Sequence, residues 1–126
     1  MDESKQVFIG TDCGATMKIL ALYKPAHQNP PTPEMMAKMN AFIDELSKAG
    51  KLIATEGRKA GGLEVKIRMR KGQLSVTDGP FTEAKELVGG FALMNIDSRE
   101  ELITLTKRFL EIAGDGESEI IEMFVP

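Results

Sequence analysis

The order of apolar runs and helix signals along the chain constrains its fold more than any other feature. Residues 17–23 form a continuous apolar run, typical of a strand covered on at least one face. After a proline-rich loop, Thr32 can cap a helix whose first residue is Pro33. Apolar residues follow at helical spacing until Gly50, which is placed to end the helix, and the pattern predicts a second strand over 51–56.

The same order returns towards the carboxyl end. Residues 91–96 are predicted to form a strand, and Ser98 with Glu101 matches a capping box that opens a helix. Gly114 is placed to end that helix, and a last strand is expected over 119–125. Two strand–helix–strand units in one chain predict an α+β domain on the ferredoxin-like plan.

An alternating sequence between the two units predicts an inserted β-hairpin. Apolar side chains occupy one face of residues 64–70 and basic side chains the other. Lys71-Gly72 supplies a turn, and residues 73–77 supply the returning strand.

The 126 residues have the length of a single domain. We expect residues 1–16 to be an N-terminal arm, either disordered or adding an edge strand, and residues 17–126 to be the domain. Two helices on one face of the sheet leave the other face in need of cover, which a second copy of the chain would supply. We therefore expect a homodimer.

Composition excludes several classes of function. Cys13 has no partner in the chain, no signal-peptide pattern is visible, and no run approaches the ~20 apolar residues of a membrane span, so we expect a cytoplasmic protein away from membranes. The net charge of −3 argues against nucleic-acid binding. One histidine and one cysteine cannot form the usual zinc set, and calcium-loop and phosphate-loop spacings are missing, so we expect no metal and no cofactor.

Charge is distributed unevenly along the chain. Residues 58–71 hold six basic residues and one acid, Glu64, whereas residues 111–122 hold five acids and no base. Both stretches can be solvated faces, and the alternative is an anion site or a contact between subunits.

Residues 76–81, Val-Thr-Asp-Gly-Pro-Phe, follow the hairpin and continue through Glu83, Lys85 and Gly89-Gly90. This pattern resembles the DGPF family, a branch of the YCII-related proteins, and the resemblance extends over nearly everything from Met17 onward. It implies a ferredoxin-like fold in a dimeric α+β barrel-type assembly, with a cleft between sheet, helix and partner subunit. The biochemical role of that family is mostly unassigned. Some relatives look like small-molecule enzymes, and DGPF proteins are often associated with sigma factors of the extracytoplasmic-function type.

The turn at residues 78–81 has two interpretations. In the functional interpretation, either Asp78 or Glu83 is a catalytic carboxylate in the cleft. Burial would raise the pKa of that carboxyl group and allow it to act as an acid or a base. We then expect Asp78 to be partly buried beside a pocket at the subunit boundary. In the structural one, Asp78 accepts hydrogen bonds from the turn, Phe81 fills the core, and the Gly79-Pro80 bond is able to be cis.

A ligand in such a cleft would lie near Asp78, Phe81 and Tyr23, with an anionic group held by a nearby arginine. Arg70 is one candidate for that arginine. The predicted ligand-binding residues are Tyr23, Arg58, Arg68, Phe81 and Glu83.

The resemblance is incomplete at one position. The YCII branch looks to place a histidine near the start of its first helix as an acid or base, whereas this chain has Met35 and Met36 there. Its only histidine, His27, lies earlier in the proline-rich loop, where solvent exposure is expected.

The sequence thus favours a DGPF/YCII-like protein that binds or transforms a small molecule as a dimer, with its cleft near the Asp-Gly-Pro-Phe turn. The alternative is a regulatory interaction module associated with a sigma factor and without catalysis. A third hypothesis, cofactor-free oxidation of aromatic substrates, rests on fold analogy alone. Whether the chain is an enzyme, and on which substrate, is not encoded in any of these motifs.

Overall fold

A computed structural model describes residues 16–27, 29–81 and 88–126 of the chain. The expected arm at residues 1–15, with Cys13, and the candidate residues Glu83 and Lys85 lie outside these ranges. The elements follow in the order β1 (Met17–Pro25), α1 (Pro33–Lys48), β2 (Leu52–Gly57), β3 (Val65–Arg70), β4 (Gln73–Asp78), β5 (Gly90–Ile96), α2 (Arg99–Ala113) and β6 (Gly116–Glu122).

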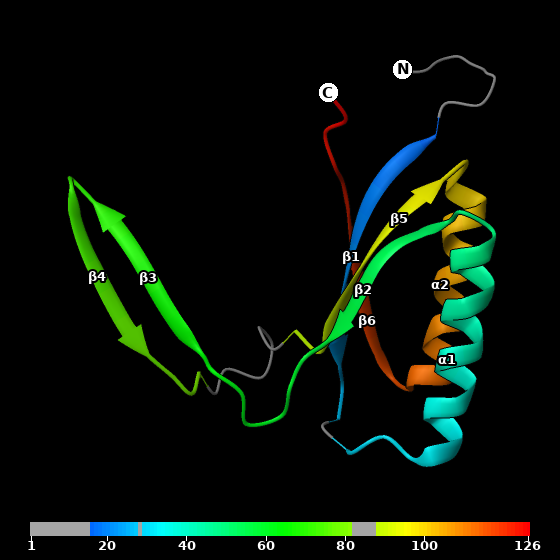
Figure 1. Ribbon diagram of the computed structural model, residues 1–126, viewed down its shortest axis with the longest axis horizontal. Helices are drawn as coiled ribbons and strands as arrows, with labels where there is room; N and C mark the ends of the chain where they lie inside the picture. The colour runs from blue at the N-terminus through cyan, green and yellow to red at the C-terminus, as the bar shows by residue number, and fades with distance from the viewer. Residues whose placement is uncertain (1–15, 28, 82–87) are drawn as a thin grey trace.

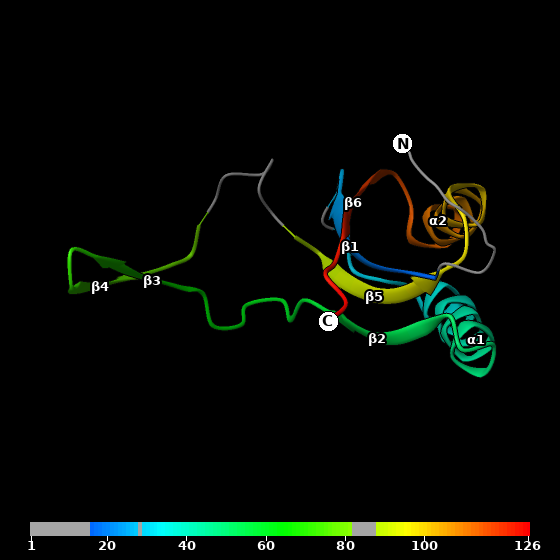
Figure 2. The same cartoon turned by 90° about the horizontal axis from the view of Figure 1, so that it is seen from above.

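Four of the strands form one antiparallel sheet in the order β2-β5-β1-β6. Both helices cover the same face of this sheet (Figures 1 and 2). The strand order and the two strand–helix–strand units are compatible with the expected ferredoxin-like plan.

Strands β3 and β4 form a separate two-stranded sheet. This hairpin extends away from the body of the protein on the side opposite the helices (Figures 1 and 2). The predicted turn is confirmed, because Lys71 and Gly72 both have positive φ, at 49° and 79°. The sequence predicted the hairpin but not its separation from the main sheet.

Both predicted helix starts are confirmed by their caps. The Thr32 hydroxyl accepts a hydrogen bond from the Met35 amide at 3.1 Å, and the Ser98 hydroxyl accepts one from the Glu101 amide at 3.1 Å. The Glu101 carboxylate accepts from the amide of Asp97 at 2.8 Å, which fixes the turn that leads into α2.

The last strand differs from the prediction, because β6 runs from Gly116 to Glu122 rather than over 119–125. Its register with β1 pairs Gly116 with Pro25 and Glu122 with Ile19. The polar start of β6 concealed it in the sequence, since an edge strand with one exposed face needs few apolar residues.

The core lies between the sheet and the helices. Its buried residues come from β1, α1 and β5, and several residues of α2 pack against them. The buried set is Ile19, Phe42, Leu46, Met94 and Ile96. Leu102, Leu105, Phe109 and Ile112, which recur at helical spacing along α2, pack on this core.

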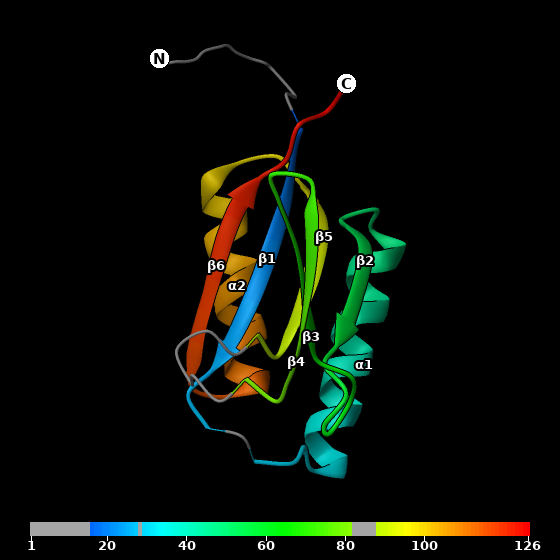
Figure 3. The same cartoon turned by 90° about the vertical axis from the view of Figure 1, so that its left-hand side faces the viewer.

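The opposite face of the sheet is not covered by the described residues, and we call it the open face. Because strand side chains alternate, Leu20 and Leu22 point away from the helix-side residues Ile19 and Ala21. The register aligns Leu93 and Ile121 with Leu20, and Phe91 with Leu22. Figure 3 looks towards this face, with the hairpin in front of it.

Truncation of the core should destabilise the protein strongly. Ile96 is fully buried, so Ile96→Ala is expected to lower the free energy of unfolding by about 2–5 kcal/mol. The control is Ile103→Ala on α2, where the side chain is 55% exposed and the loss should be below about 1 kcal/mol. Urea denaturation measures both, and equal losses would contradict this assignment of the core.

Candidate functional site

A cavity of about 310 Å³ lies between the helix-side face of the sheet and the two helices. Most of its lining is apolar. The larger apolar residues that line it are Met39, Phe42, Ile43, Leu46, Leu52, Phe91, Met94, Leu105 and Phe109. Among the described residues of the lining none is basic, and Glu56 is the acidic one.

Small residues on the sheet create this space. Ala21 pairs with Ala92 across β1 and β5, and Tyr23 pairs with Gly90 one position further along the same face. Ala21, Ala92 and Gly90 all line the cavity. Helices that rest on larger residues at both sides cannot close down onto this patch, so a void remains between the two layers.

Four residues that line the cavity carry a hydroxyl group, namely Tyr23, Thr55, Thr106 and Ser118, and the hydroxyls of Tyr23 and Thr55 have backbone acceptors. The Tyr23 hydroxyl lies 3.2 Å from the carbonyl of Gly114 and 3.3 Å from that of Asp115, to which it donates. Thr55 donates its hydroxyl hydrogen to the carbonyl of Phe91 at 2.7 Å. Each oxygen thus keeps its lone pairs for a donor from elsewhere.

The environment of Tyr23 keeps its phenol protonated. Its ring packs edge-on against Phe109, with centroids 5.0 Å apart. Burial raises the pKa of Tyr23, and the negative charge of Asp115 raises it further. Tyr23 is therefore a neutral hydroxyl at physiological pH and not an anionic base.

The Asp-Gly-Pro-Phe turn lies at the root of the hairpin and is held by Glu64. The Glu64 carbonyl accepts from the Gly79 amide at 2.8 Å, and its carboxylate accepts from the Phe81 amide at 3.0 Å. Arg58 forms an ion pair with the same carboxylate. We call these three contacts the Glu64 clasp.

The clasp explains the glycine of the turn. A Cβ atom on Gly79 would lie 2.8 Å from the Cβ of Glu64, so a larger residue would force the strands apart. The Gly79-Pro80 bond is cis, as the sequence allowed. Among the described residues of the turn, the amides of Gly79 and Phe81 donate to Glu64 rather than to Asp78, which the structural interpretation had named as the acceptor.

The charge of Glu64 is stabilised by its neighbours. The amide hydrogen bond from Phe81 is the main cause that lowers the pKa of the Glu64 carboxyl, and Arg58 contributes further. Sequence reasoning noted Glu64 only as the one acid in a basic stretch. The position of Glu64 as the one acid among six basic residues could have indicated its role, because an acid surrounded by cations commonly forms an ion pair.

The predicted site residues do not converge on one pocket. Tyr23 lines the cavity, and Arg58 directly follows the lining residue Gly57. Arg58 and Phe81 are brought together through Glu64. Phe81 is half-buried, and the Lys66 ammonium group lies over its ring, 4.4 Å from the ring centroid. The structural interpretation expected Phe81 to fill the core, but Phe81 is not among the core residues.

The remaining candidates lie away from the cavity. Asp78 ends β4 opposite Val65, and its side chain is exposed, so the expected partial burial is wrong for a single chain. Arg68 is exposed on β3 opposite Ser75. His27 is exposed, as expected. The catalytic role of Asp78 and the ligand-binding roles stay predictions.

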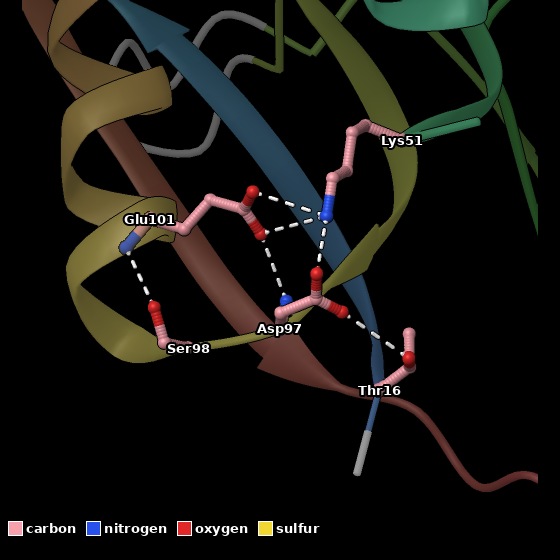
Figure 4. A network of polar contacts seen from close by, with 5 residues as sticks. All are labelled: Thr16, Lys51, Asp97, Ser98 and Glu101. Atoms are coloured by element: carbon pink, nitrogen blue, oxygen red, sulfur yellow. Dashed lines mark hydrogen bonds and ion pairs between the residues drawn. The ribbon is translucent and has the colours of Figure 1, made fainter. Parts of the chain in front are cut away.

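A second polar cluster joins the start of β2 to the start of α2 (Figure 4). Lys51 donates to Asp97 at 2.7 Å and approaches Glu101 at 3.0 Å, while Thr16 donates to Asp97 at 3.2 Å. Hydrogen bonds to Asp97 and then to Glu101 raise the pKa of Lys51. Lys51 is therefore a paired cation that anchors α2, and it is unsuited to act as a base or nucleophile.

Two further searches of the described residues give negative results. Within the ranges given above, no three His, Cys, Asp or Glu side chains gather closely enough to hold a metal ion. Neither α1 nor α2 has the length and apolar character needed to cross a bilayer.

Comparison with known protein families gives a match over most of the chain. A family model described as the YCII-related domain matches residues 16–123. No curated protein matches the sequence.

The clasp makes a testable electrostatic prediction. Glu64 should titrate below the ordinary glutamate pKa, and Arg58→Gln should raise its pKa only in part, because the Phe81 amide still donates. Since the pKa is lowered in the folded state, Glu64 contributes stability above its unfolded-state pKa, and this contribution is lost as pH falls through the folded-state pKa. Carboxyl-detected NMR titration measures the effect.

The control is Arg70→Gln, which removes the same charge at the hairpin tip, where Arg70 pairs with Gln73. This variant should leave the Glu64 titration unchanged. A wild-type Glu64 that titrates at or above the ordinary glutamate value would contradict the clasp.

Proposed function

The chain belongs to the YCII-related family, and from that premise we propose that it is a small-molecule-binding homodimer whose ligand occupies the cavity between sheet and helices. The observation that carries the proposal is the apolar cavity of about 310 Å³ with two hydroxyl acceptors in its wall. Its size lies at the lower end of the range for ligand pockets. The ligand is accordingly small.

The lining chemistry also defines the kind of ligand. Apolar and aromatic side chains favour a ring or a short hydrocarbon, and Phe109 and Phe42 offer ring faces and edges. Tyr23 and Thr55 have committed their hydrogens to backbone carbonyls, so they accept rather than donate. The best ligand is therefore a neutral aromatic alcohol or amine that donates a hydrogen bond.

A carboxylate ligand fits this cavity poorly. The described lining residues include no base to neutralise it, and burial of an unpaired anion is costly. The earlier expectation of an anionic group held by arginine needs Arg58, Arg68 or Arg70, none of which lines the cavity. Arg58 is already paired with Glu64.

Two other roles expected from the sequence make different demands. A site at the Asp-Gly-Pro-Phe turn, with Asp78 as its carboxylate, requires the turn to bind the ligand. A regulatory module associated with a sigma factor requires no small molecule. Three roles are thus distinguished by whether a small molecule binds, and by whether substitutions in the cavity or at the turn abolish that binding.

Phenols and anilines should stabilise the wild-type protein in a thermal-shift assay. A ligand at about a hundred times its dissociation constant adds roughly 2.7 kcal/mol. Matched methyl ethers, which lack the donor, and benzoates, which carry a charge, should stabilise less. Ala92→Leu fills the cavity floor and should remove most of the effect, because Ala92 lines the cavity.

The control is Ala37→Leu, the same substitution on the exposed surface of α1, which should retain ligand binding. Asp78→Asn keeps the shape of the side chain and should also retain it. Loss of binding in Asp78→Asn but not in Ala92→Leu would move the site to the turn. No stabilisation by any phenol or aniline would contradict the proposed ligand class.

A further inference from the structure

The β3–β4 hairpin has one apolar and one basic face. The register pairs Ile67 with Val76 and Met69 with Leu74, so these four side chains share a face. They are exposed by 62%, 59%, 66% and 62% in the order just given. Lys66, Arg68 and Arg70 alternate with them on β3 and point to the other side.

A hairpin in this situation needs a surface to pack on. Isolated two-stranded hairpins are at best marginally stable in water, because they bury too little apolar area to offset the entropy lost on ordering. Here the apolar face makes no contact with the core, which lies beyond the main sheet. The alternation of apolar and basic residues is thus the pattern of a strand pair with one covered face.

The open face of the main sheet has the same requirement. Leu20, Leu93 and Ile121 form one row across it, and Leu22 and Phe91 form the next. Ile121 and Phe91 are exposed by 42% and 36%. Two apolar surfaces of this kind on one chain complement each other in a pair of chains.

Charge complements the apolar match. Glu119 and Glu117 lie on the open face of β6, opposite Leu22 and Lys24, and Glu56 lies beside Phe91 on β2. Lys24 forms an ion pair with Glu119 at 2.7 Å, and Lys18 is the other cation of this face. Acids therefore outnumber bases on the face, and the hairpin that would meet it carries an excess of bases.

We propose that each β3–β4 hairpin packs its apolar face on the open sheet face of a second copy of the chain, reciprocally about a two-fold axis. This inference rests on the homodimer of the proposed function and names the surfaces that form it. The strands of the hairpin are about 20 Å long, which is enough to cross both apolar rows. Arg68 and Arg70, on long flexible stems, give the outer face of the docked hairpin a positive charge that attracts the acidic margin of the partner sheet.

The Glu64 clasp acts as the root of this arm. It ties the start of β3 to the residues that follow β4, through Arg58, Gly79 and Phe81. A hairpin fixed at its root extends in a defined direction, so less orientational freedom is lost when it docks.

Sedimentation equilibrium over a concentration series tests the arm directly. Ile67→Glu and Val76→Glu place a charge on the apolar face of the hairpin and should each raise the dimer dissociation constant at least about tenfold. Ile121→Glu on the open face should act in the same way. Neither Ile67 nor Val76 belongs to the core, and far-UV circular dichroism verifies the fold of each variant.

The matched control is Ser75→Glu, the same charge on the same hairpin but on the face of Arg68, its cross-strand partner. It should change the dissociation constant by less than about threefold. A dimeric wild type whose affinity is unaffected by Ile67→Glu and Val76→Glu would overturn the arm and leave the homodimer intact. Equal weakening by Ser75→Glu would overturn apolar docking, and a wild type that stays monomeric at about 100 μM would overturn both the arm and the homodimer.

Discussion

The main sheet has apolar residues on both faces but helices on one, and this imbalance governs the rest of the structure. On the helix side, Ile19 and Ile96 are almost completely buried and anchor the core. On the other side, Leu20 and Leu93 lie in the described chain without a covering layer. An exposed apolar sheet face costs free energy in water, so the same sequence that builds the core also creates a surface that requires a partner.

The cavity results from the small size of two residues on the helix-covered face of the sheet. Ile19 and Met94 are large and fill the space beneath the helices, whereas Ala21 and Ala92, one step along the same strands, are small. The helices are held apart from the sheet by the large residues and cannot collapse onto the small ones. The hydroxyl groups of Tyr23, Thr55, Thr106 and Ser118 then add hydrogen-bonding groups to a mostly apolar wall. The candidate site is therefore formed by omission of side-chain volume, and Glu56, the acid of its described lining, is paired with Phe91 on the open-face register.

Local signals in the sequence predicted the elements well. Caps at Thr32 and Ser98 and the Lys71-Gly72 turn depend on residues near in sequence, so their effects can be inferred without the fold. The separation of the hairpin could not be inferred this way, because alternation shows which side chains share a face but not what covers that face. The cavity was hidden for the same reason, since it depends on Ala21 and Ala92 meeting across two strands distant in sequence. Glu64 was missed because motif reasoning considered only the residues of the turn, whereas the acceptor is the residue just before β3.

The clasp places the two functional surfaces in one chain of contacts. Arg58 donates its amide to the Gly89 carbonyl at 2.8 Å, and Gly89 donates its own to the Tyr23 carbonyl at 2.7 Å. Tyr23 lines the cavity, while Arg58 holds the carboxylate that fixes the root of the hairpin. The cavity wall and the arm therefore share a short backbone path, and a hairpin docked on a second subunit restrains the same residues that border the ligand. In the proposed reciprocal dimer this arrangement would couple assembly to the order of the candidate site, because restraint of Arg58 and Gly89 would reduce the conformational entropy that the protein loses when a ligand binds.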